Sequence, residues 1–193
     1  PEAPSERESV QKTMTAEEFM ALPDDGIDRE LIRGELREYG MTVRSRWHSQ
    51  IEAALSYFLI AWLRSQSKVR GEILCGEVGF RLRGPSDSLV GIDIAYVSNQ
   101  LMMSTPPKQG TFHGPPLLAI EILSSSDTVQ RIAEKVELYL DSGVTTWIVN
   151  PEFHTITIHR PGQEAVMYNR DDELPGDPEL SGFRLKLSEL FPV

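Results

Sequence analysis

The order of the predicted elements indicates an α/β or α+β protein in which a mixed central sheet lies between helices. Residues 47–65 place apolar side chains at helical spacing, which predicts a long amphipathic helix. Residues 117–123 form a near-continuous apolar run, typical of a strand that is covered on both faces. A second helical pattern follows that run directly. At 193 residues, the chain is long enough to bury a sizeable core.

The N-terminal part of the chain is expected to contain a tail, a short helix and a hairpin. Residues 1–13 are polar and predict a flexible tail, followed by a single domain over residues 14–193. Thr15 and Glu18 have the spacing of a capping box, which predicts a short helix just before a proline. In DRELIRGELREYG, two short apolar pairs flank a glycine-bearing turn, a pattern that favours a β-hairpin.

The middle of the chain is expected to contain three strands and a long loop. The strand candidates cover residues 69–75, 77–83 and 92–97, with the turn sequence GPSD between the second and the third. Residues 99–116 contain Pro and Gly and predict a loop that is long for a compact domain, which suggests a functional segment. Cys75 is expected to be a small buried side chain, and as the single cysteine it excludes an internal disulfide.

The last third is expected to add one helix and to extend the sheet. A second capping-box pattern, at Asp127 and Gln130, predicts a helix that runs to about Asp141 and ends at Gly143. TTWIVN and TITIHR predict a pair of strands joined by PEFH. After Gln163, a polar DDELPGDPE loop lies between short strand candidates.

The net charge of −10 limits the classes of function. It argues against a protein that coats nucleic acid, because such binding needs Lys and Arg to displace phosphate counterions. It does not exclude a nucleic-acid enzyme, but an acidic site repels phosphate until a divalent cation bridges the two, so we expect a metal. No apolar run reaches the ~18 residues of a membrane span. With no signal segment and one cysteine, we expect a cytoplasmic protein.

Two carboxylates lie within strands that are predicted to be buried. Asp93 is in GIDIAYVS and Glu121 is in LLAIEIL. A carboxylate in that environment needs a cation, a proton or a metal to compensate it. On neighbouring strands, the two would place four oxygens around one point, an arrangement that suits Mg²⁺. Taken alone, Asp93 also fits a carboxylate at a strand end that is exposed or paired with an arginine.

Lys135 supplies a third group. It flanks the apolar face of the second predicted helix, beside Tyr139. If that helix packs back across the preceding strand, the lysine stem can lie along the core edge and bring the ammonium to Glu121. The alternative is a lysine whose ammonium remains at the surface.

These residues resemble a known nuclease pattern. Asp on one strand followed by Glu-X-Lys on the next is the metal-dependent PD-(D/E)XK motif, although Ile92 stands here in place of Pro and Leu123 in place of Lys. The ordered set MTAEEFMALP, RELIRGEL, His48 opening a helix, GEVGFRL, IDIAYVS, LLAIEILSSSD and EKVELYLDSGVTTWIVNPE resembles the bacterial family formerly called domain of unknown function 820. The resemblance implies a restriction-endonuclease-like α/β fold, a mixed central sheet flanked by helices, and an endonuclease acting on nucleic acid, chiefly DNA.

The resemblance also implies which residues form the site. Asp93, Glu121 and the carbonyl of Ile122 would bind Mg²⁺ or Mn²⁺, which lowers the pKa of a bound water. Lys135 would stand in for the lysine of the motif and stabilise charge in the transition state.

Two further residues correspond to family positions near the site. Glu30 would orient the lysine or touch metal-bound water, and otherwise is an exposed hairpin residue. His48 would reach a phosphate or shuttle a proton, and otherwise is a surface residue at a helix end. Glu77 is a weaker candidate that also fits a strand-end charge, and Ser124 fits either a phosphate contact or a helix cap.

Other functions stay open at this point. The domain could instead be a catalytically weak or inactive nuclease fold that serves as a binding or assembly module, or it could hydrolyse small nucleotides. Arg44, Arg46 and Trp47 form the best basic and aromatic stretch, which either touches a nucleic-acid backbone or is an ordinary loop. A homodimer is expected, because restriction-type domains often pair to cut two strands.

Overall fold

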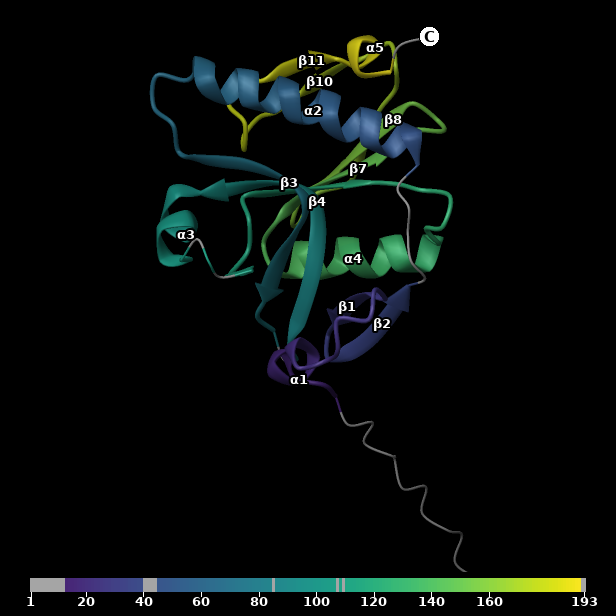
Figure 1. Ribbon diagram of the computed structural model, residues 1–193. Helices are drawn as coiled ribbons and strands as arrows, with labels where there is room; N and C mark the ends of the chain where they lie inside the picture. The colour runs from purple at the N-terminus through teal and green to yellow at the C-terminus, as the bar shows by residue number, and fades with distance from the viewer. Residues whose placement is uncertain (1–12, 40–44, 85, 107, 109, 192–193) are drawn as a thin grey trace, which may run out of the picture.

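A computed structural model of the chain shows a nine-stranded mixed sheet between two helices (Figure 1). Helix α2 (Arg46–Ser65) covers one face and α4 (Val129–Asp141) covers the other. The predicted α/β architecture, a mixed central sheet flanked by helices, is confirmed. The structure describes residues 13–39, 45–84, 86–106, 108 and 110–191.

The sheet has the strand order β2-β1-β4-β6-β7-β8-β9, with β3 paired to β4 and β5 paired to β3. Strands β6 and β7 run parallel, joined by α4, as do β3 and β5, whereas the other pairs are antiparallel. Strands β10 and β11 form a separate hairpin that packs with α5 beside α2. The remaining elements are α1 (Ala16–Met20), β1 (Asp28–Ile32), β2 (Glu35–Tyr39), β3 (Gly71–Leu82), β4 (Ser88–Ser98), α3 (Asn99–Ser104), β5 (Thr111–His113), β6 (Leu118–Ile122), β7 (Thr145–Asn150), β8 (Thr155–His159), β9 (Val166–Tyr168), β10 (Glu173–Pro175), β11 (Arg184–Lys186) and α5 (Leu187–Leu190).

Strand β6 separates two hydrophobic cores. Ile120 packs in the core that α2 covers, together with Leu59. Ala119 packs in the core that α4 covers, together with Tyr139. Because side chains alternate along a strand, Glu121 must face the α4 side. The alternation therefore directs this carboxylate toward the helix that carries the predicted lysine.

The first predicted helix and the hairpin are confirmed. The Thr15 hydroxyl accepts from the Glu18 amide at 3.1 Å, and the Glu18 carboxylate accepts from the Thr15 amide at 2.9 Å, which completes the capping box of α1. Strands β1 and β2 pair around Arg33 and Gly34, which have φ angles of 51° and 80°. Two consecutive residues with positive φ give a tight turn whose twist suits a hairpin.

The long helix predicted over residues 47–65 is also confirmed. The Ser45 hydroxyl caps α2 by accepting from the amide of His48 at 3.1 Å. The buried side chains Ile51, Leu55, Leu59 and Leu63 recur at helical spacing and face the sheet. None of the helices in the described ranges is long and apolar enough to cross a membrane.

The two strands predicted over residues 69–75 and 77–83 are one strand, so this prediction was wrong. Strand β3 continues through a β-bulge at Gly76 and Glu77, which have φ angles of 91° and 57°. The bulge shifts the register on β4 without ending the pairing. Cys75 precedes the bulge and is exposed, contrary to the expectation that it would be buried.

The loop predicted over residues 99–116 contains two elements, and this prediction was also incomplete. Helix α3 begins where the Ser98 hydroxyl accepts from the Leu101 amide at 3.2 Å. Strand β5 adds to the free edge of β3, where Phe112 stacks on Phe80 with a centroid distance of 5.2 Å. Short elements of this kind are held by tertiary contacts, which a local pattern does not reveal.

Helix α4 begins one residue later than predicted. Its N-cap is Thr128, not Asp127. The Asp127 carboxylate instead accepts from the amide and the hydroxyl of Ser124 at 2.7 and 2.9 Å, which closes the turn before the helix. Ser124 therefore does not cap the helix. The predicted end is confirmed, because α4 stops at Asp141 and Gly143 follows with a φ of 76°.

The C-terminal part follows the prediction in outline. Strands β7 and β8 form the predicted pair, and PEFH is the turn between them. The polar DDELPGDPE segment contains strand β10, which the sequence did not indicate. The predicted tail over residues 1–13 falls outside the described residues except for its last position, and the single domain over residues 14–193 stays a prediction.

Candidate active site

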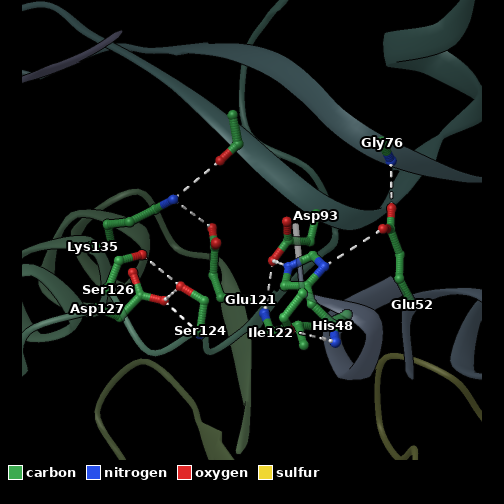
Figure 2. A network of polar contacts seen from close by, with 12 residues as sticks. His48, Glu52, Gly76, Asp93, Glu121, Ile122, Ser124, Ser126, Asp127 and Lys135 are labelled. Atoms are coloured by element: carbon green, nitrogen blue, oxygen red, sulfur yellow. Dashed lines mark hydrogen bonds and ion pairs between the residues drawn. The ribbon is translucent and has the colours of Figure 1, made fainter. Parts of the chain in front are cut away.

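A cavity of about 210 Å³ lies where β4 and β6 separate, bordered by β1 and α4. Four of the five residues predicted to be catalytic line it, and each comes from a different element. Asp93, Glu121 and Lys135 are labelled in Figure 2. The fifth, His48, contacts one of these four from α2. The residues in question are Glu30 on β1, Asp93 on β4, Glu121 on β6 and Lys135 on α4.

Asp93 stands at the point where the two strands diverge. The pairing of β4 with β6 ends at Ile94 and Ile120. Beyond that pair, the Asp93 Oδ2 atom accepts from the amide of Ile122 at 2.8 Å (Figure 2). The side chain thus replaces a main-chain acceptor, which satisfies the end of β6 and holds the carboxylate in one orientation.

His48 approaches the same oxygen. Its Nε2 lies 3.3 Å from Asp93 Oδ2, its Nδ1 lies 3.8 Å from Glu52 Oε2, and its side chain is 1% exposed. Burial alone would raise the pKa of Asp93, but His48 and the Ile122 amide stabilise the charged form and leave that pKa below its usual value. Asp93 is therefore an ionised acceptor at neutral pH.

Lys135 reaches the cavity as predicted and is buried. Its Nζ donates to Glu30 Oε1 at 2.9 Å and to the carbonyl oxygen of Gly91 at 3.1 Å, and it lies 3.0 Å from Glu121 Oε1. Burial by itself would lower the pKa of Lys135, but the surrounding carboxylates outweigh burial and hold that pKa well above its usual value. The ammonium is charged and joins two of the acids.

Glu121 carries the excess negative charge of the cluster. Its Oε1 also accepts from the Tyr139 hydroxyl at 2.5 Å, and its side chain is 13% exposed. Burial raises the pKa of Glu121 to about 7, the charge of Lys135 opposes this rise, and the nearby Asp93 and Glu30 add to it. Burial, together with two neighbouring carboxylates that the single ammonium only partly offsets, explains why this acid resists losing its proton.

Comparison with known proteins decides the family. The sequence profile of the Uma2 family, described as "Putative restriction endonuclease", matches residues 16–188. The chain belongs to the Uma2 family. This confirms the predicted resemblance to the family formerly called domain of unknown function 820.

A solved structure supports the fold of this Uma2 chain. It is described as a putative nuclease belonging to DUF820 from Anabaena variabilis ATCC 29413 and aligns with a TM-score of 0.76. The two are 22% identical over 92% of this chain and 97% of that one. A likeness at this level of identity shows that the two chains share a fold, and the description of the Uma2 profile gives that fold its restriction-endonuclease-like class. A search of functionally curated proteins finds no match.

Two residues of the cluster in this Uma2 chain were not predicted to act there. The Tyr139 hydroxyl binds Glu121, and Arg131 has its Nη2 3.6 Å from Glu30 Oε2. The guanidinium of Arg131 also lies 3.5 Å from the centre of the Tyr39 ring. Arg131, Lys135 and Tyr139 recur every four residues and therefore share one face of α4. That spacing is visible in the sequence, but by itself it shows only that the three side chains share a face.

The weaker candidates lie at the margins. Glu77 lines the cavity from the bulge of β3. Ser124 lies in the turn that precedes α4. Arg46 and Trp47 are exposed at the start of α2, with Trp47 51% exposed, and Arg44 lies outside the described residues.

The donor atoms fit a hard divalent cation that keeps part of its water. Asp93 Oδ1 and Glu121 Oε2 accept no hydrogen bond from the described residues, although the other oxygen of each carboxylate is engaged. In the described ranges, no group of three or more His, Cys, Asp or Glu side chains is arranged to hold a metal. A cation here would need the two acids, water and a main-chain oxygen such as that of Ile122, a donor set that suits Mg²⁺ or Mn²⁺.

Proposed function

We propose that this Uma2 chain is a metal-dependent endonuclease that hydrolyses phosphodiester bonds in nucleic acid, and DNA in particular. The supporting observation is that Asp93, Glu121 and Lys135, from two strands and a helix, meet at one cavity. Family membership supports the reaction class.

The two acids and the carbonyl of Ile122 would hold Mg²⁺ or Mn²⁺. When bound, the cation supplies charge neutralisation at the phosphate and a lower pKa for a water. Asp93 is suited to this role because the Ile122 amide and His48 fix one of its oxygens and leave the other available. His48 thereby positions the acid, and it is also close enough to Asp93 to exchange a proton with a group bound there.

Lys135 would stabilise the negative charge that develops at the phosphate. Its ammonium is held between Glu30 and Glu121, so it is oriented before substrate arrives. Glu30 positions this lysine and is itself approached by Arg131. A phosphate oxygen that enters beside Glu121 would take over one of the ammonium contacts, so no side chain has to move far.

The test is cleavage of a mixture of supercoiled plasmid and labelled single-stranded and duplex oligonucleotides with Mn²⁺. Asp93→Asn keeps the shape of the side chain and should reduce the rate by about a hundredfold or more, since it removes a ligand charge. Glu164→Gln, an exposed substitution outside the cavity, is the matched control. Equal rates for the wild type and Asp93→Asn, or cleavage that persists in EDTA, would count against the proposal.

One observation favours a second function, a binding or assembly module with an inactive nuclease fold. Lys135 and Tyr139 contact Glu121 and partly compensate its charge. Titration calorimetry with Mn²⁺ separates the two functions, because an inactive module should give no binding heat. Mononucleotides and dinucleotides in the cleavage panel would identify a hydrolase of small nucleotides.

Two further proposals concern the state of the protein in the cell. Cutting both strands of a duplex needs two sites, so we propose that the functional unit is a homodimer, which light scattering would detect. The single cysteine fits a reducing compartment, and we propose a cytoplasmic location.

A further inference from the structure

A groove of about 660 Å³ borders the candidate active site and ends on an exposed tryptophan. Leu123, Asp127 and Ile132 line both the cavity and the groove. The groove then passes Asn150 and reaches Trp47. A strand whose phosphate occupies the cavity would therefore have a place for its neighbouring nucleotide in this groove.

The Trp47 ring is supported from within the protein. It packs against His154 with a centroid distance of 6.1 Å, and His154 in turn stacks on Phe191 with a centroid distance of 5.4 Å. The Phe191 side chain is fully buried. The Trp47 ring nevertheless remains 51% exposed. Trp47 also directly precedes His48, which contacts Asp93. An exposed aromatic ring that is already held in place loses little conformational entropy when a flat ligand stacks on it.

Polar groups along the groove match a nucleobase better than an apolar peptide. The Asn150 Oδ1 atom accepts from the amides of Glu152 and Phe153 at 3.0 and 3.1 Å. The side-chain NH₂ of Asn150 donates to no partner within the described residues. Ser125 also lines the groove, and Arg46 is exposed beside Trp47. An aromatic ring, an amide donor and a nearby cation are the groups that recognise unpaired bases.

We propose that Trp47 stacks on an unpaired base next to the phosphate held at Asp93 and Glu121, and that Asn150 donates to the polar edge of that base. The inference rests on the proposed nuclease function and extends it to a substrate class, a single strand or a nucleotide turned out of a duplex. A base that remains inside a duplex is stacked on both faces and offers no free face to Trp47.

The test measures binding of a short fluorescein-labelled single-stranded DNA of mixed sequence by anisotropy, with Ca²⁺ as the cation. Trp47→Ala should raise the Kd roughly 5- to 100-fold, the range expected for loss of one base stack, and Trp47→Phe should raise it much less. Tyr57→Ala is the matched control, because Tyr57 is 67% exposed on the same helix, about 15 Å further along its axis. This control should leave the Kd within about twofold of the wild type.

Probes with a single abasic position locate the contact. When the abasic position is the one that contacts Trp47, the Kd of the wild type should rise by the same factor as Trp47→Ala causes with the intact probe. The Kd of Trp47→Ala should not rise further with that abasic probe. Equal Kd values for the wild type and Trp47→Ala would overturn the inference, while Mn²⁺-dependent cleavage by the wild type would still support the nuclease. If Trp47→Ala left the Kd unchanged but altered the molar mass of the protein in solution, this face would be a protein interface, and the inference would again be overturned. A wild type that neither binds nor cleaves any probe would overturn both proposals.

Discussion

Replacing Glu121 with Gln removes one of the two carboxylates that contact the Lys135 ammonium, with little change in side-chain shape. In the folded protein, burial raises the pKa of Glu121 to about 7, whereas its ordinary value is 4.5. Ionisation is therefore harder in the folded state than in the unfolded state. Protonated Glu121 therefore contributes to the free energy of unfolding. This contribution is fully present below pH 4.5 and is lost as the pH rises through about 7.

The size of this effect follows from the shift. Moving the pKa of one group from 4.5 to about 7 corresponds to about 3 kcal/mol in the free energy of unfolding. Gln does not titrate, so the variant should lack this loss. The difference in the free energy of unfolding between Glu121→Gln and the wild type should therefore rise by about 3 kcal/mol, in favour of the variant, from pH 4.5 to pH 7.5. This rise does not depend on how the two proteins compare at low pH.

The measurement is urea unfolding of the metal-free protein at a series of pH values in EDTA. Glu164→Gln serves as the control and should differ from the wild type by no more than about 0.5 kcal/mol throughout. Parallel stability curves for Glu121→Gln and the wild type would refute the reasoning, because they would mean that Lys135 and Tyr139 compensate the ionised acid completely.

Three further outcomes are expected. Lys135→Met leaves the buried acids without their cation and should lower the free energy of unfolding by about 3–5 kcal/mol, and a loss in urea of less than about 1 kcal/mol would contradict the pairing. Thr15→Ala removes the capping box of α1 and should cost about 1 kcal/mol in thermal unfolding, with Mn²⁺-dependent cleavage unchanged. Gly34→Ala should cost more than about 1 kcal/mol in the same thermal assay, because its φ is 80° and its new Cβ would lie 2.7 Å from the Thr13 Cβ, so a variant as stable as the wild type would contradict the turn.

Strong local patterns predicted most of the fold. The apolar period of α2 and the flanked Arg33-Gly34 turn depend on contacts between near neighbours, and the structure has both elements. The bulge at Gly76 and the start of α4 depend on partners elsewhere. Thr128 rather than Asp127 caps α4, because the Asp127 carboxylate is already bound to Ser124 in the preceding turn. The spacing of a capping box gives no information about that turn.

The candidate site could be predicted in part for a similar reason. Carboxylates at Asp93 and Glu121 stand out because their neighbours are apolar, so the cost of burying them is visible in the sequence. Arg131 and Tyr139 do not stand out, since an arginine near a helix start and a tyrosine on an apolar face are common. Only the packing of α4 against β1 and β6 shows that Arg131 contacts Glu30 and that Tyr139 contacts Glu121.

The pair of Lys135 and Glu30 joins residues that are 105 positions apart in the chain. Strand β6 also needs β7 as its neighbour on one edge. During translation, the ribosome must therefore release the polypeptide through β7 before the acids, the ammonium and the strand that carries Glu121 can come together. A truncated product that stops before α4 would lack the ammonium altogether and would leave Glu30 and Glu121 without their lysine partner.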